Sequence, residues 1–347
     1  MTNTHISETG TPAPDPYTGI VLHERVTTGE RVRHALGWAS ARFSVIGVWI
    51  LFVILYAILV PDTFLTAGAF RTIFGSQQAV VFLAAALLCT IIVGEFVDMS
   101  VPSNFGLAAT LVTVLNVNHG VNVWVAALVA IVVSTVVGLV NALLIVKVGV
   151  NTIVVTLGMM TFLLGIGLWL SNLMPVSGLP SSFSQIALFE ILGLPLSFYL
   201  GLMLMLAFAY VLTFTPLGRN MRFVGENREV SRLAGVRVTR VRIGAFIAAG
   251  MIAGLGGVIA AAGTGGFDPA SSQAYLLPMF AATFLGTAVL FPGRFNPIGT
   301  LIAIYFLATG VLGLQLLGGT SWVSNVFYGG VLVIAVTLST ILNKKSR

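Results

Sequence analysis

Charged side chains are scarce in this chain of 347 residues. Asp, Glu, Lys and Arg together make up 8% of the sequence, whereas 57% of its residues are hydrophobic. In soluble domains roughly a quarter of all residues are charged. This composition therefore excludes a globular protein that covers its surface with polar groups in water. Such a chain needs the hydrocarbon of a membrane as its solvent. We therefore expect a polytopic membrane protein.

Cysteine and histidine are also rare, and their scarcity excludes several kinds of chemistry. The single cysteine, Cys89, lies in an apolar stretch and cannot form a disulfide within the chain. The four histidines are scattered, and no two have the spacing of metal ligands. No pair of carboxylates and no nucleophile beside a base stands out either. We expect no catalytic residue, no metal site and no cofactor in this chain, and nothing supports an intramembrane enzyme.

Only three lysines occur, Lys147, Lys344 and Lys345, and none lies in the G-x-x-x-x-G-K-[ST] pattern that cradles nucleotide phosphates. If ATP drives this protein, another subunit must hydrolyse it. The net charge of +6 does not indicate a nucleic-acid partner, because the basic residues occupy short segments between apolar runs. Cytoplasmic loops of membrane proteins have this pattern.

Apolar runs of roughly 20 residues, the length that crosses a bilayer, recur from Phe43 onwards. They predict an all-α bundle of about ten transmembrane helices. Small residues in "GMIAGLGG" (Gly250–Gly257) recur at intervals of four, which favours close packing of helix backbones. The expected helices cover 43–60, 73–94, 103–117, 122–147, 151–171, 196–214, 243–263, 275–291, 298–317 and 321–342.

The basic residues also predict the orientation in the membrane. With both termini in the cytoplasm, Lys147, Arg294, the loop 215–242 and the basic tail 343–347 all lie inside, and only Arg71 falls outside. The transmembrane domain is then 43–342. The tail 1–42 lies inside; its first 20 residues are expected to be disordered, and its basic remainder is a candidate interfacial helix.

The loop 215–242 concentrates seven arginines in an otherwise apolar chain. Its segment "GENREVSRLAG" (225–235) predicts a short helix, with Asn227 as N-cap, Glu229 in the first turn and Gly235 as left-handed terminator. Val230, Leu233 and Ala234 recur at i, i+3 and i+4 and form one apolar stripe. A helix of two turns is unstable alone, so we expect it to dock into a groove of another protein. The alternative is a basic topology signal lying on anionic lipid.

This segment is similar to a known one. "TPLGRNMRFVGENREVSRLAGVRVTRVRIGAF" resembles the cytoplasmic coupling segment of ABC importer permeases of the ribose and simple-sugar type. Val230-Ser231 stands where that family often has two alanines. The matching residues are Thr215, Gly218, Arg219, Gly225, Asn227, Arg232, Leu233, Ala234 and Gly235.

Two further stretches resemble the same family. "GEFVDMSVP" (94–102) is similar to its G-G-I-D-L-S-V-G, with Asp98 and Ser100 retained, whereas Glu95, Phe96 and Pro102 replace glycines. "LFPGRFNPIGT" (290–300) retains Gly293, Gly299 and Thr300 of a glycine-rich pattern. The resemblance assigns a structural or gating role to Asp98, Ser100, Gly293 and Gly299.

The resemblance implies the permease subunit of an ATP-driven importer for a monosaccharide, located in a bacterial cytoplasmic (inner) membrane. It implies three partners: an ATPase that binds ATP and Mg²⁺, an extracytoplasmic solute-binding protein that meets 172–195 and 264–274, and a second permease copy or paralogue. The residues assigned to ATPase coupling are Arg219, Gly225, Asn227, Arg228, Glu229, Val230, Arg232, Leu233, Ala234 and Gly235.

An uncharged path through the membrane suits a neutral polar solute, and polar or aromatic residues of the spans are candidates to line it. A buried Asn or Thr can equally bond a neighbouring helix. The candidates are Asn104, Phe105, Asn141, Asn151, Thr152, Thr156, Thr161, Trp169 and Gln315.

Two other functions stay open from the sequence. A related permease for branched-chain amino acids or nucleosides would share the coupling segment. A secondary carrier working alone would place ionisable groups in its spans, and Glu95 and Asp98 are the candidates for its proton relay. Their position at a span boundary favours instead a hydrogen-bonded break between two helices.

Overall fold

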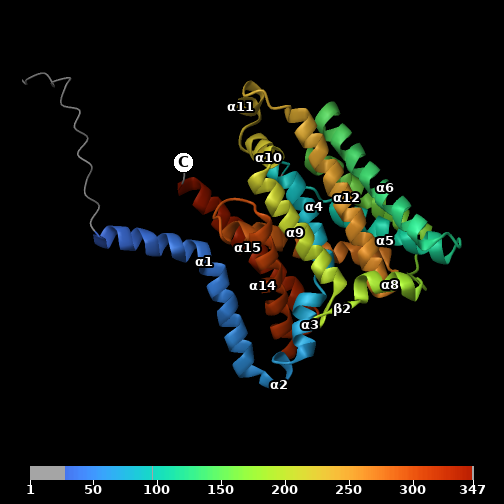
Figure 1. Ribbon diagram of the computed structural model, residues 1–347, viewed down its shortest axis with the longest axis horizontal. Coiled ribbons are helices and arrows are strands. Elements are labelled where there is room, and N and C mark those ends of the chain that lie inside the picture. Colours follow the sequence, from blue (N-terminus) through green and yellow to red (C-terminus); the bar gives the residue numbers. More distant parts are fainter. Residues whose placement is uncertain (1–27, 96, 346–347) are drawn as a thin grey trace, which may run out of the picture. The chain divides into compact units, whose positions relative to one another are not determined.

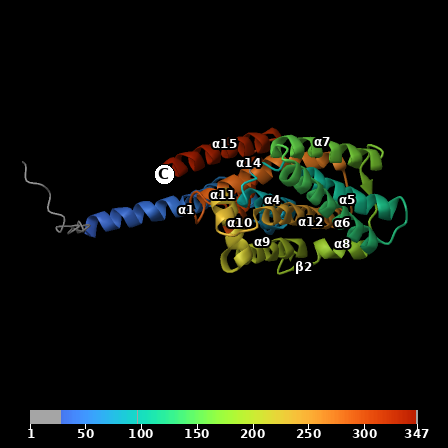
Figure 2. The same ribbon diagram turned by 90° about the horizontal axis from the view of Figure 1, so that it is seen from above.

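The computed structural model describes residues 28–95 and 97–345, with side chains described for 43, 45–95 and 97–337. The chain divides into a unit up to Ser40 and a second unit, Ala41–Arg347, which contains the helical bundle of Figures 1 and 2. The predicted disorder of residues 1–20 lies outside the described residues. Within the stretch predicted to form an interfacial helix, a helix begins at Thr28.

Helices occupy all ten predicted intervals, and those at 103–117, 196–214 and 243–263 are helical over their full lengths. They are α1 (Thr28–Leu59), α3 (Ala67–Gly75) with α4 (Gln78–Ile92), α5 (Val101–Val117), α6 (Val123–Ala142), α7 (Thr152–Leu170), α9 (Leu196–Phe214), α12 (Val238–Thr264), α13 (Leu276–Leu285), α14 (Pro297–Leu316) and α15 (Trp322–Lys345).

The chain is a mostly helical, polytopic membrane protein. Within the described ranges, six helical segments are long and apolar enough to cross a membrane. Shorter apolar helices cover 45–59, 101–117 and 322–337. The number of ten crossings and the cytoplasmic position of both termini stay predictions.

The predicted helix 275–291 is wrong in its second half. α13 ends at Leu285, a 3₁₀ turn covers Gly286–Ala288, and Leu290 takes a positive φ of 61°. The side chain of Asn296 holds this turn by donating to the carbonyls of Gly286 (3.2 Å) and Val289 (3.3 Å). Nonhelical backbone at membrane depth is tolerated where protein covers it, and Gly286, Ala288 and Val289 are buried.

The core of the bundle forms where α12 packs against α4, α5 and α6. A Cβ atom at Gly250 would collide with the carbonyl oxygen of Ser134 in α6, and one at Gly257 with the carbonyl oxygen of Phe105 in α5. Ser134 Oγ also donates to the Gly250 carbonyl at 2.9 Å. The predicted close packing through small residues is therefore confirmed.

The bundle has two distinct ends (Figure 1). At one end lie α10 (Pro216–Glu226) and α11 (Arg228–Leu233), and at the other lie α3, α8 (Ser181–Leu188) and the hairpin of β2 (Glu190–Ile191) and β3 (Leu194–Pro195). β1 (Val176–Ser177) pairs antiparallel with β4 (Gly266–Phe267). The two segments expected to face a solute receptor, 172–195 and 264–274, are thus joined. The remaining short elements are α2 (Pro61–Phe64), η2 (Pro269–Tyr275) and a π-helical turn, η1 (Leu143–Val148), which continues α6.

Candidate functional site

The coupling segment folds as two short helices, each begun by its own capping side chain. Thr215 Oγ1 accepts a hydrogen bond from the backbone N–H of Gly218 at 3.2 Å at the start of α10. Asn227 Oδ1 accepts from the N–H groups of Glu229 (3.0 Å) and Val230 (3.1 Å) at the start of α11. These bonds satisfy amides that have no partner within the helix, and the predicted Asn227 cap is confirmed.

The backbone conformation at the end of α11 is also as predicted. Gly235 takes a left-handed φ of 81°, and the N–H of Val236 donates to the carbonyl of Ser231 at 3.0 Å, which closes the last turn. The helix itself ends at Leu233, two residues before the predicted limit. Local residues therefore specify both ends of a helix that is too short to persist through its own hydrogen bonds.

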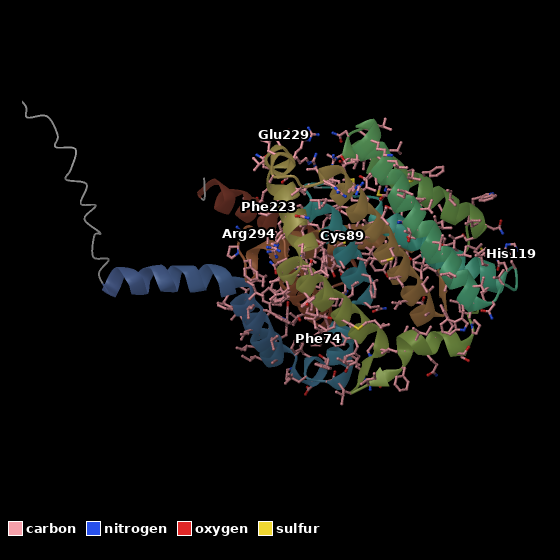
Figure 3. The ribbon with its side chains drawn as sticks, turned by 45° about the horizontal axis from the view of Figure 1, so that its top comes forward. Phe74, Cys89, His119, Phe223, Glu229 and Arg294 are labelled. Atoms are coloured by element: carbon pink, nitrogen blue, oxygen red, sulfur yellow. The ribbon has the colours of Figure 1, made fainter. Side chains whose placement is uncertain are left out.

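The apolar stripe of α11 points away from the rest of the protein. Leu233 is 88% exposed and Val230 59% exposed, whereas Ser231 on the same helix is buried. Figure 3 shows Glu229 at the tip of this end of the bundle and Phe223 of α10 near it. A groove of about 440 Å³ runs between the two helices and is lined by Pro216, Arg219, Asn220, Phe223, Glu226, Asn227, Val230, Ser231, Ala234 and Val236.

α10 touches the bundle through glycine backbones at its C-terminal end. A Cβ atom at Gly225 would collide with the carbonyl oxygen of Ile92, the last residue of α4, and would lie 3.4 Å from the amide of Gly94. Gly94 itself has a positive φ of 83°, which favours glycine. Two glycines thus let the coupling segment rest directly on the turn that follows α4.

Glu95, the next residue of that turn, carries the most extensive set of charged contacts among the described residues. Its side chain is 3% exposed. Its Oε1 accepts from Arg228 Nη2 at 2.8 Å and from Arg242 Nε at 2.6 Å, and its Oε2 accepts from Thr152 Oγ1 at 2.7 Å. Arg228 Nη2 also donates to the carbonyl of Gly94 at 3.0 Å. We refer to Glu95, Thr152, Arg228 and Arg242 as the Glu95 cluster.

This cluster was not predicted from the sequence, in which Glu95 stood out only as a departure from a family glycine and as half of a proton-relay candidate. The available signal was one acidic residue at a span boundary on the side that carries seven arginines, but the pairing partners lie 133 and 147 positions away in the chain.

Asp98 and Ser100 form a hydrogen-bonded break between α4 and α5. Asp98 Oδ1 accepts from the N–H (3.1 Å) and Oγ (2.6 Å) of Ser100. Asn141 Nδ2 in turn donates to Ser100 Oγ at 2.9 Å, and Asn104 Nδ2 donates to the Ser134 carbonyl at 3.1 Å. The Oδ1 atoms of both asparagines are buried and have no partner among the described residues.

Three of the path candidates lie at the start of α7, and two of them contact Glu95 and Val97. Asn151 Oδ1 caps the helix by accepting from the Ile153 amide at 2.9 Å. Thr152 bonds Glu95, and Thr156 Oγ1 donates to the carbonyl of Val97 at 3.1 Å. Further along α7, Thr161 is exposed and Trp169 is 75% exposed, on an open outer face.

The other predicted residues lie apart from this group. Phe105 is fully buried and packs edge to face against Phe267 and Tyr275. Gln315 Nε2 donates to Ser324 Oγ at 3.2 Å. Gly293 has a φ of 80° and, with Arg222 and Arg294, lines a separate cavity of about 450 Å³; Arg294 is labelled in Figure 3. Gly299 approaches the Gly286 carbonyl too closely to leave room for a side chain.

The coupling segment and the Glu95 cluster both lie within the residues that match a known protein family. A family model described as "Branched-chain amino acid transport system / permease component" matches residues 70–336. The autoinducer 2 import system permease protein LsrD of Yersinia enterocolitica is 28% identical over 260 residues, covering 73% of this chain and 78% of that protein. The protein of the same name from Escherichia coli K12 is 29% identical over the same lengths. No solved structure matches the chain.

Proposed function

Because the chain belongs to the family of permease components of branched-chain amino acid transport systems, we propose that it forms the solute path of an ATP-driven importer for a monosaccharide. This proposal rests on the structure of α11. It is a capped helix whose Val230 and Leu233 are exposed, and it lies in the loop with the highest density of arginine. In the predicted orientation this loop faces the cytoplasm.

Exposed apolar side chains on a short helix suit the groove of a partner protein. The partner proposed here is a cytoplasmic ATPase that binds ATP and Mg²⁺, since this chain lacks the phosphate-binding lysine pattern. Burying a leucine side chain fully contributes about 1.5–3 kcal/mol. Of the other coupling residues named from the sequence, Arg219 and Ala234 line the groove beside Val230.

The solute path is proposed to run along α7, where Thr161 and Trp169 lie on the exposed face. A second copy of the permease or a paralogue would complete the path from the other side. The unpartnered oxygens of Asn104 and Asn141 favour these residues as further polar positions when the helices rearrange. At the opposite end, the β1–β4 pair and α8 offer the surface proposed for an extracytoplasmic binding protein.

The choice of a monosaccharide rests on the simple-sugar type of the coupling segment and on the uncharged spans. The second candidate is a branched-chain amino acid, which the description of the matching family favours. The names of the relatives add autoinducer 2 as a third solute to test. Their identity to this chain does not choose between these solutes, and the binding protein is expected to make the selection.

Reconstituted transport tests this proposal. The permease is placed in proteoliposomes with the ATPase and binding protein encoded beside it, and uptake of labelled monosaccharides, branched-chain amino acids and autoinducer 2 is measured. We expect uptake of a monosaccharide that requires ATP, the ATPase and the binding protein together. Uptake by the purified chain alone, driven by a proton or sodium gradient, would instead show a secondary carrier.

A further inference from the structure

We propose that Glu95 is a positioning residue that transmits movement of α11 to α7, with Arg228 as its releasable partner and Arg242 as its permanent one. The inference rests on the proposed function, because it gives the coupling helix a route into the bundle. It concerns a carboxylate that stands where the resembling family has glycine, so the coupling segment alone does not imply it.

The first observation is that one buried carboxylate oxygen has two arginine partners. A buried charge that loses its last partner is strongly destabilising. Glu95 Oε1 bonds both Arg228 and Arg242, so the carboxylate keeps an arginine partner when Arg228 leaves.

The second observation is the unequal burial of the two arginines. The side chain of Arg228 is 41% exposed, whereas that of Arg242 is 15% exposed. Arg242 belongs to α12, the central helix of the core. Arg228 is the first residue of α11, so any movement of α11 carries its backbone along. Arg228 is therefore the partner that detaches.

The third observation concerns the hydrogen bond to the other carboxylate oxygen of Glu95. Its Oε2 accepts from Thr152 in the first turn of α7. One turn later, Thr156 bonds the Val97 carbonyl in the same connecting segment. A displacement of Glu95 and Val97 therefore acts directly on the end of the helix that carries the proposed path.

These contacts define a two-state sequence. In the described state, Arg228 ties α11 to Glu95 and to the Gly94 carbonyl. When a docked ATPase shifts α11, Arg228 leaves both acceptors while Arg242 keeps the carboxylate paired. Glu95 can then shift about Arg242, its remaining arginine partner, together with Thr152, and α7 changes its position.

A double-mutant cycle in the reconstituted importer tests the proposal. The variants are Glu95→Gln, Arg228→Gln and the two combined, and the readouts are solute moved per ATP hydrolysed and the thermal stability of the purified complex. Arg240→Gln is the matched control, because this exposed arginine lies in the same loop but is not among the residues assigned to ATPase coupling. Arg242→Gln serves as the stability comparison.

Arg228→Gln is expected to lower the solute moved per ATP about tenfold, the size of one hydrogen bond to a charged group, without lowering thermal stability. The combined variant should be no worse than Glu95→Gln. Arg240→Gln should transport normally, and Arg242→Gln should lose stability. Normal coupling in Arg228→Gln, a stability loss equal to that of Arg242→Gln, or multiplying effects in the combined variant would each overturn the inference.

The wild-type complex separates failure of this inference from failure of the proposed function. If the wild type moves solute only with ATP and Arg228→Gln does so equally well, only the role of Glu95 is wrong. If the wild-type chain moves solute without the ATPase, the proposed function is wrong and this inference falls with it.

Discussion

Gly225 shows at the scale of a single residue why the coupling segment needs glycine. The C-terminal end of α10 rests on the carbonyl of Ile92 with no room for a Cβ atom. The helix itself does not require glycine there, since its hydrogen bonds form with any residue except proline. The requirement comes from the approach of two backbones that are far apart in sequence.

Gly225→Val is expected to push α10 away from the turn at Gly94 and to cost about 1–3 kcal/mol, the usual range for overpacking. Thermal unfolding of the purified protein measures this loss. Gly244→Ala is the matched control, because a Cβ atom at this α12 position meets nothing within 4 Å; alanine there should stabilise the helix by about 0.5–1 kcal/mol. Equal effects of the two changes would contradict the packing argument.

Substitution of Asp98 distinguishes a carboxylate with a structural role from one that carries a proton. Its Oδ1 accepts two hydrogen bonds from Ser100, and an amide oxygen can accept them equally well. Asp98→Asn is therefore expected to keep solute uptake and its pH profile, whereas Asp98→Ala should lower thermal stability. A proton-driven carrier would behave differently: uptake by Asp98→Asn would collapse or lose its pH dependence.

At the scale of elements, α11 is defined by what it leaves exposed. Leu233→Asp changes a side chain that is 88% exposed, so folding and membrane insertion should be unaffected. Uptake should be lost, because an unpaired carboxylate would have to enter an apolar groove. ATP-driven uptake in proteoliposomes and protein levels in the membrane measure the two effects.

Leu233→Met is the matched control for this change, since methionine keeps a similar apolar volume and should retain uptake. Normal uptake by Leu233→Asp would show that α11 does not dock into an apolar groove, and a defect shared by both variants would point to a requirement for leucine itself.

Elements set by neighbouring residues were predictable, and those set by distant ones were not. The cap at Asn227 and the terminator at Gly235 act within a few residues, so the sequence alone identified α11. The end of α13 depends on the Asn296 side chain, ten residues away from Gly286. The continuous apolar sequence there gave no sign that the helix ends. The Glu95 cluster joins three elements through ion pairs across more than a hundred residues, which no local pattern encodes.

At the scale of the whole molecule, the two ends of the bundle carry different chemistry. One end presents the arginine-rich coupling segment, and the other presents α8 and the joined segments 172–195 and 264–274 (Figure 1). Arg71, the basic residue predicted outside, pairs with Glu190 at 3.0 Å at this second end. Such exposed pairs contribute little stability. The distribution of charge fits the predicted orientation.

The central claim is that α11 docks onto a separate ATPase. A photo-crosslinking amino acid at position 233, in the full chain in its native membrane, tests it most directly, with the same group at Leu192, which is 92% exposed in the β2–β3 hairpin at the opposite end, as control. We predict an adduct from position 233, and none from position 192, with a protein that carries the G-x-x-x-x-G-K-[ST] pattern. Adducts of position 233 with lipid alone would contradict the account.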